Sequence, residues 1–334
     1  MKLEVRPYAL AFPKPLQTAS GPVPERVGHH LRLGAAIGEV VTWPGFGSDD
    51  PSRVTKELDH LATVDVPTLD SVAEIDAWLA DTVQTPEVRA GVELLLLDRL
   101  ALQQERTLAS LLTPEPTDMV RLHQLVNDAA DTPLHAHAIK MKVGSDIDAG
   151  WLRVSGVRER VGPETPIRLD ANGSWTVPEA EEALGRFAEA RVEFVEQPIA
   201  AGDVAAFAAL RAASPVPLAA DESIRSAESL EELLDADAID VAVLKPAFAG
   251  GVLATQRLAE RAMTNGVKVV ITHALGSIVE RSGALHLAAA LKLRSACGLS
   301  HPFASERGCG YTVAGGIAHV PEAHGLGIDR SRLQ

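Results

Sequence analysis

Five charged residues recur at nearly equal spacing, each near the end of a short apolar run: Lys142, Asp170, Glu196, Asp221 and Lys245. The successive gaps are 28, 26, 25 and 24 residues. Carboxylates that converge on one place repel each other unless a cation neutralises them. Oxygen ligands select a hard divalent cation, so the three acids predict a magnesium site in which manganese can substitute.

A simpler interpretation is that each acid caps the helix that follows it. Asp221 suits that role, because it precedes Glu222 and Ser223 at an expected helix start. Glu196 suits it less, because a Gln-Pro pair follows. Three acids at one common period favour the metal site.

Two lysines flank Met141, and the alternation of side chains along a strand places Lys140 and Lys142 on one face. Neighbouring ammonium groups are costly to bury unless carboxylates lie beside them. A lysine crowded by a second lysine and a divalent cation should have a lowered pKa, which suits a general base near neutral pH. The alternative is a solvated strand end.

A repeating order of strand and helix must position these residues. From about residue 117, short apolar runs alternate with helical stretches, which predicts parallel strands joined by crossover helices. One βα unit of a β/α barrel takes roughly 25–30 residues, in agreement with the gaps. The carboxyl ends of the strands then ring one mouth, where barrel active sites lie. An open doubly wound sheet is disfavoured, because no Gly-rich phosphate loop follows the first strand.

The position of each strand in an eight-membered ring also places the lysines. Lys142 falls on the second strand and Lys245 on the sixth. These strands lie on opposite sides of the ring, so the two lysines are expected to face each other across a metal.

Residues 1–112 are expected to form a separate α+β unit. Its first part predicts an antiparallel meander, and the stretches SVAEIDAWLADTV and PEVRAGVELLLLDRLALQQ predict helices, the second opened by Pro86. The barrel is expected over residues 113–309, with residues 310–334 packing back on the first unit. The Pro/Gly-rich stretch 13–28 is a candidate lid over the barrel mouth.

Composition limits the possible partners. The 334 residues include 31 basic and 45 acidic side chains, a formal net charge of −14. Such a chain is a poor binder of nucleic acids and of anionic membranes. It has neither a signal-like N-terminus nor an apolar run near the ~20 residues of a membrane span. Cys297 and Cys309 lack metal or disulfide spacing, so a cytoplasmic protein with reduced thiols is expected. A homo-oligomer is compatible with the sequence.

Five short motifs together resemble the muconate-lactonising subgroup of the enolase superfamily. They are KMK at 140–142, DAN at 170–172, EQP at 196–198, DES at 221–223 and LKP at 244–246. The resemblance covers nearly the whole chain, and Gly38-Glu39 lies where the family's capping domains carry a Gly-Glu pair. It implies a modified TIM barrel, (β/α)7β, with an N-terminal α+β capping domain.

The resemblance also implies roles for single residues. Asp170, Glu196 and Asp221 would bind magnesium. Lys142 would be the general acid and base, Lys245 would act from the opposite face, and Lys140 would lie beside the substrate carboxylate.

Within the subgroup the chain is most similar to the o-succinylbenzoate synthases. The chain is short, residues 297–303 read CGLSHPF, and the Asp-x-Asp motif of dipeptide epimerases is missing there. This implies a carbon–oxygen hydro-lyase acting on a small carboxylate, 2-succinyl-6-hydroxy-2,4-cyclohexadiene-1-carboxylate, in menaquinone biosynthesis. An N-acylamino-acid racemase or dipeptide epimerase would use the same five residues. A non-catalytic, metal-stabilised barrel is the third interpretation.

Three further residues are candidates for substrate binding. Gly276 and Ser277 precede a helical stretch, whose free N–H groups suit the succinyl carboxylate, although Ser277 can equally be an ordinary helix cap. His273 ends the seventh strand and either contacts substrate or hydrogen-bonds within the mouth. The remaining histidines considered show no ligand spacing and are expected at the surface: His29, His30, His135 and His137.

Overall fold

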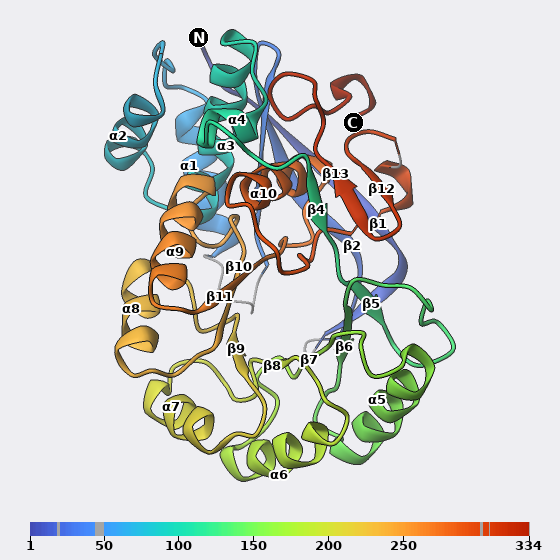
Figure 1. Cartoon of the computed structure of the whole chain (residues 1–334). Helices are drawn as coiled ribbons and strands as arrows, with labels where there is room; N and C mark the ends of the chain where they lie inside the picture. The colour runs from blue at the N-terminus through green and yellow to red at the C-terminus, as the bar shows by residue number, and fades with distance from the viewer. Residues whose placement is uncertain (19–20, 44–49, 301–302, 307, 334) are drawn as a thin grey trace.

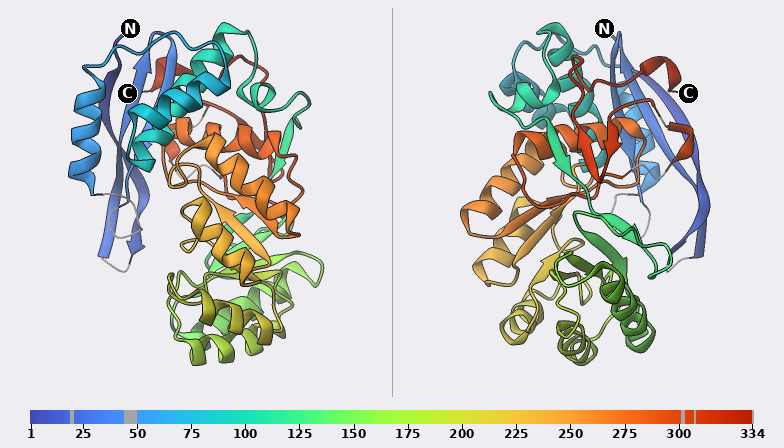
Figure 2. Two further views of the ribbon diagram at one scale, coloured as in Figure 1. Left: turned by 90° about the vertical axis from the view of Figure 1, so that its left-hand side faces the viewer. Right: turned by 45° about the vertical axis from the view of Figure 1, so that its right-hand side comes forward.

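The computed structural model describes residues 1–18, 21–43, 50–300, 303–306 and 308–333. His301 and Pro302 of the CGLSHPF segment, and residues 19–20 of the candidate lid, lie outside these ranges. Figures 1 and 2 place an N-terminal unit at one end of the molecule and the barrel below it, with both chain ends on the N-terminal side.

The N-terminal unit is an antiparallel sheet covered by helices. Its strands pair in the order β1 (Glu4–Thr18), β2 (Gly21–Leu33), β3 (Ala36–Val41). The helices are α1 (Pro51–Leu61), α2 (Val72–Thr82), α3 (Pro86–Gln103) and α4 (Leu108–Leu112). The meander and the Pro86 helix start are confirmed, but β1 and β2 are longer than predicted. They absorb the candidate lid into a hairpin that extends along the barrel (Figure 2).

Two glycines let the sheet and helix α3 approach closely. A Cβ atom added to Gly38 would overlap the carbonyl oxygen of Gly91, and one added to Gly91 would overlap the side chain of Val40 and the backbone of Glu39. The backbones of β3 and α3 are therefore in direct contact. This contact fixes Glu39, the residue after Gly38, against the barrel.

Seven parallel strands form the barrel sheet, and neighbours in the sheet are neighbours in sequence. They are β5 (Gln124–Val126), β6 (Ile139–Lys142), β7 (Ile167–Asp170), β8 (Phe194–Glu196), β9 (Leu218–Ala220), β10 (Val241–Leu244) and β11 (Lys268–Ile271). The outer helices are α5 (Ile147–Val161), α6 (Val177–Ala188), α7 (Val204–Ala213), α8 (Ala227–Asp235), α9 (Val252–Thr264) and α10 (Ile278–Ala290) (Figure 1).

Cys297 and Gly298 take the eighth position of the ring. Cys297 bridges in parallel to Leu122, just before β5, and Gly298 bridges to Thr272, just after β11. The backbone N–H of Gly298 donates to the carbonyl of Ile271 at 2.9 Å. The barrel is thereby closed, and the predicted (β/α)7β fold with a capping unit is confirmed. One crossover departs from it, since residues 127–138, all of them described, contain no helix.

The last part of the chain contacts both units. A small antiparallel sheet joins β4 (Met119–Arg121) to β13 (Ile317–His319) and β12 (Thr312–Ala314). Two short 3-10 helices, Ala304–Glu306 and Arg330–Arg332, complete the described elements. The N–H of Leu326 donates to Asp98 of α3 at 2.8 Å. The exact domain boundaries at 112 and 309 stay a prediction.

Among the described residues, no helix has the length and apolar character that a membrane span requires. Cys297 and Cys309 are both buried and form no disulfide.

Candidate active site

The three acids predicted to bind metal lie at the carboxyl ends of adjacent strands. Asp170 and Glu196 are the last residues of β7 and β8, and Asp221 directly follows β9. Their exposed fractions are 3%, 2% and 6%. The capping interpretation is wrong, because the N-cap residues of the helices that follow are Thr176, Asp203 and Ser226.

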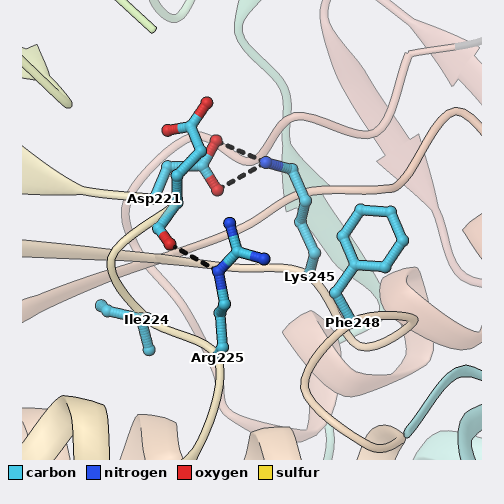
Figure 3. Close-up of a pocket in the computed structure, with 6 residues that line it drawn as sticks. Asp221, Ile224, Arg225, Lys245 and Phe248 are labelled. Atoms are coloured by element: carbon cyan, nitrogen blue, oxygen red, sulfur yellow. Dashed lines mark hydrogen bonds and ion pairs between the residues drawn. The ribbon is translucent and has the colours of Figure 1, made fainter. Parts of the chain in front are cut away.

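Two lysines lie among these acids. Lys140 Nζ is 2.8 Å from both carboxylate oxygens of Glu196 and 2.9 Å from Asp170 Oδ2. Lys245 Nζ pairs with both carboxylate oxygens of Asp221 (Figure 3). Two ammonium groups therefore balance charge among three buried carboxylates.

The charges shift one another's pKa values. Burial raises the pKa of Glu196 to about 8; Lys140 opposes this shift, and the neighbouring carboxylates of Asp170 and Asp221 add to it. Burial would lower the pKa of Lys140, but Asp170 and Glu196 outweigh it and the net shift is upward. The pKa of Lys245 is raised in the same way by Asp221. The sequence analysis predicted a lowered pKa for one lysine of the Lys140–Lys142 pair beside a bound divalent cation, and this stays a prediction.

Lys142 differs from Lys140 although they share a strand. Met141 between them is fully buried, whereas Lys142 is exposed at the carboxyl end of β6. Lys142 lies directly across from Asp170 in the strand register. Within the described ranges its ammonium group has no ion-pair or hydrogen-bond partner, so Lys142 is the lysine of the pair that is open to a substrate.

The strand order gives the relation between Lys142 and Lys245. Strands β7, β8 and β9 separate β6 from β10 on one side of the ring. On the other side lie β11, the 297–298 segment and β5. The two lysines therefore stand on opposite sides of the mouth, with the three acids on the strands between them.

The acids suit a hard cation by their chemistry. In the part of the chain that the structure describes, no three histidine, cysteine or acidic side chains converge closely enough to hold a metal ion. Lys140 and Lys245 supply the positive charge there. The donors are nevertheless all buried carboxylate oxygens, which is the set that Mg²⁺ prefers. A cation would have to displace these ammonium groups to bind among the acids.

Gln197 was missed by the sequence analysis. It is fully buried, with a positive φ of 41°. Its side-chain oxygen accepts the N–H groups of Asp221 and Ser223 at 3.1 and 3.2 Å. Its side-chain nitrogen donates to Ile199 O and Ser223 Oγ, both at 2.8 Å. Gln197 therefore fixes the loop that carries Asp221, and the EQP motif was the available signal.

An interaction between Arg168 and His123 inside the barrel was also not predicted from the sequence. Arg168, two residues before Asp170 on β7, is 2% exposed and donates to Glu193 at 2.7 Å. Its Nη1 lies 3.3 Å from His123 Nδ1. Burial, with the charges of Lys140 and Arg168, holds the pKa of His123 well below its usual value. His123 is thus neutral and can accept the arginine hydrogen bond.

The helix N-terminus predicted to hold the succinyl carboxylate is already occupied. Glu39 accepts the N–H groups of Ser277 and Glu280 at 2.7 and 2.8 Å. Glu306 accepts that of Ile278 at 2.7 Å, and Ser277 Oγ accepts that of Val279. The prediction of free N–H groups at Gly276 and Ser277 is therefore wrong, and Ser277 is the N-cap of α10.

The histidines near this helix are placed by other contacts. His273 is half-buried, and its Nδ1 accepts the N–H of Leu275 at 2.9 Å. His30, predicted at the surface, is buried; it stacks on Tyr8 at 4.4 Å and lies 3.1 Å from Ser277 Oγ. His30 belongs to the contact between the N-terminal sheet and the barrel, whereas His273 lies at the mouth.

Comparison with known sequences agrees with this architecture. The family model described as Enolase C-terminal domain-like matches residues 122–332. The o-succinylbenzoate synthase of Thermobifida fusca is 43% identical over 149 residues, or 44% of this chain and 45% of that protein. The N-succinyl-L-Arg/Lys racemase of Bacillus cereus is 29% identical over 196 residues, which are 58% of this chain and 53% of that protein. The chain spans about half the length of the curated relatives that it matches.

Solved structures show the same fold over the whole chain. The N-succinyl Arg/Lys racemase from Bacillus cereus has a TM-score of 0.88 at 21% identity, covering 99% of this chain and 97% of that one. A dipeptide epimerase from Enterococcus faecalis, solved with Mg and the dipeptide L-Leu-L-Tyr, has a TM-score of 0.84 at 22% identity, covering 98% of each chain.

Proposed function

The chain belongs to the Enolase C-terminal domain-like family, and from that premise we propose that it is a magnesium-dependent o-succinylbenzoate synthase. The proposed reaction removes water from 2-succinyl-6-hydroxy-2,4-cyclohexadiene-1-carboxylate. The observation that carries the proposal is that Lys142 and Lys245 flank three buried acids across one barrel mouth. The match to the Thermobifida fusca synthase supports the choice of substrate.

The two lysines have different tasks in this reaction. Lys142, which is exposed and has no partner in the described chain, takes the proton from the carbon beside the substrate carboxylate. It then gives that proton to the departing hydroxyl group, so that the lost atoms leave as water. Lys245 stays protonated on the opposite face and stabilises negative charge.

Lys140 and the acids complete the proposed site. Lys140 holds the substrate carboxylate with its ammonium group. Asp170, Glu196 and Asp221 would hold magnesium, which when bound supplies positive charge where negative charge develops on the substrate. Gln197 holds the Asp221 loop in place.

A second candidate is the racemisation of N-succinyl amino acids. The match to the Bacillus cereus racemase supports this candidate. That match covers 58% of this chain at 29% identity, whereas the match to the Thermobifida fusca synthase covers 44% at 43% identity. Racemisation would require both Lys142 and Lys245 to exchange protons. Dehydration requires this of Lys142 alone.

The test uses the two substrate classes in parallel. We expect fast formation of the aromatic product from the cyclohexadiene. N-succinyl amino acids of each hand, incubated in heavy water, should show little deuterium incorporation. Lys142→Ala should lower turnover by about 10²–10⁴-fold, while Lys56→Ala, at an exposed lysine, serves as a control. Racemisation without dehydration would overturn the synthase assignment, and equal efficiency would show a dual-function enzyme.

A further inference from the structure

A pocket beside Lys245 extends the mouth of the barrel. The space free of protein atoms there is about 290 Å³, a volume that includes open solvent. Six residues line it, from the loops that follow β9 and β10: Asp221, Glu222, Ile224, Arg225, Lys245 and Phe248 (Figure 3). The catalytic proposal uses only Asp221 and Lys245, which leaves the other residues of the pocket without a role.

Arg225 is the cation of this pocket that the reaction does not use. Its Nε donates to the backbone carbonyl of Glu222 at 2.9 Å, which orients the guanidinium group. Figure 3 shows this group pointing toward the Asp221–Lys245 pair. Its two Nη atoms have no hydrogen-bond or ion-pair partner among the described residues. A planar guanidinium held by one edge and open at the other matches a carboxylate.

The rest of the pocket is lined by two apolar side chains, Phe248 and Ile224, and by the carboxyl group of Glu222. Phe248 packs against a buried cluster that includes Tyr8 and Val41 of the N-terminal sheet. Ile224 is 7% exposed. Glu222 accepts a hydrogen bond from Asn172 Nδ2 at 3.2 Å. The pocket therefore places apolar side chains next to an open guanidinium, with the carboxyl groups of Asp221 and Glu222 beside them. A carboxylate at the end of a short acyl chain can approach that guanidinium from the side that is open to solvent.

We propose that Arg225 binds the distal carboxylate of the succinyl group, while the reacting carboxylate lies near Lys140. This inference rests on the proposed function for the identity of the substrate. It assigns to Arg225 the role that the helix α10 N-terminus does not fill, since Glu39 and Glu306 hold those N–H groups.

The test compares two ligands that differ only at the far end. One is o-succinylbenzoate, and the other is 2-butanoylbenzoate, in which a methyl group replaces the distal carboxylate. Calorimetry with magnesium should show the wild-type protein preferring o-succinylbenzoate by about 10–100-fold, as expected for a charge-assisted bidentate pair. Arg225→Met should remove most of that preference, and Arg225→Lys should restore part of it. Arg294→Met, at an exposed arginine outside this pocket, is the matched control.

Steady-state kinetics give a second readout. Arg225→Met should raise KM for the cyclohexadiene by about 10–100-fold and leave kcat within about threefold, because the distal contact is uniform binding. A loss of affinity for both ligands in equal measure would mean that Arg225 only supports the fold, and would overturn the proposal. The proposal would also be overturned if the wild-type protein bound o-succinylbenzoate and 2-butanoylbenzoate equally well.

The two proposals can fail separately. If the preference depends on Arg225 but no dehydration is found, the carboxylate subsite stands and the synthase assignment falls. If dehydration is found and the preference is the same in Arg225→Met, the synthase assignment stands and the subsite falls.

Discussion

Glu93 of helix α3 accepts a hydrogen bond from the backbone N–H of Leu253 in the first turn of barrel helix α9, at 2.9 Å. The two residues are 160 positions apart in the sequence. Glu93 is fully buried, and within the described structure its Oε2 atom has no hydrogen-bond partner. Burial raises the pKa of Glu93 to about 7, although the Leu253 N–H opposes the shift. The contact between the two units therefore contains a carboxyl group that keeps its proton near neutrality.

This pKa predicts how stability depends on pH. Between pH 4.5 and 7 the folded state holds a proton at Glu93 that the unfolded state releases, so this group lowers stability as pH rises. The full cost above pH 7 is about 3 kcal/mol at 1.36 kcal/mol per pKa unit. Glu93→Gln removes the titration. Urea unfolding should show its advantage over wild type growing from pH 5 to pH 8, whereas the exposed Glu182→Gln should show none. Parallel pH curves for wild type and Glu93→Gln would contradict this.

The close approach at Gly38 predicts a large effect of one methyl group. Gly38→Ala places a Cβ atom on the carbonyl oxygen of Gly91, so β3 must move away from α3. We expect a loss of about 2–4 kcal/mol of unfolding free energy. Gly185→Ala is the matched control, because Gly185 lies within helix α6 with open space around it. That variant should gain roughly 0.5–1 kcal/mol. Equal stability of the two variants would disprove the contact.

The two lysines of β6 should respond differently to removal. Lys142→Ala should lower the rate by about 10²–10⁴-fold at an unchanged melting temperature, because Lys142 is exposed. Lys140→Met leaves Asp170 and Glu196 buried without their ammonium partner. In magnesium-free buffer it should cost about 3–5 kcal/mol. Thermal unfolding of both proteins checks this, and a normal melting curve for Lys140→Met would rule out the ion pairs.

Magnesium should stabilise the wild-type protein. At about 100 times its Kd, a ligand that binds only the folded state adds about 3 kcal/mol. Glu196→Gln should lose most of this gain, and Glu182→Gln should keep it. The measurement is the melting temperature across a magnesium titration, alongside turnover in excess chelator. Full activity in chelator would refute the metal site.

The five charged residues at the mouth could be found from the sequence for a physical reason. A βα repeat brings the same strand position to one rim once per unit, so the spacing of Asp170, Glu196 and Asp221 already implied their common location. The same repeat located Lys142 and Lys245 on opposite strands. Helix starts such as Pro86 are local signals and were equally accessible.

Contacts between distant segments were beyond such reasoning. Glu39 and Ser277 are 238 residues apart, and no local pattern says that a carboxylate from the sheet will occupy the N-terminus of α10. The sequence also does not say whether Glu196 pairs with the ammonium group of Lys140 or with a metal ion. Gln197 and Arg168 were missed because their bonds cross from strand to strand inside the barrel.

Closing the ring at Cys297 has a consequence during protein synthesis. Cys297, the bridge partner of Leu122, is synthesised 175 residues after it. At 5–20 residues per second this is a delay of about 9–35 s. The delay is longer for Asp98, whose hydrogen-bond donor Leu326 is synthesised later still. A nascent chain paused before residue 297 exposes two unpaired edges, at β5 and β11. We therefore expect the barrel of a growing chain to stay open until the segment that contains Cys297 and Gly298 has left the ribosome.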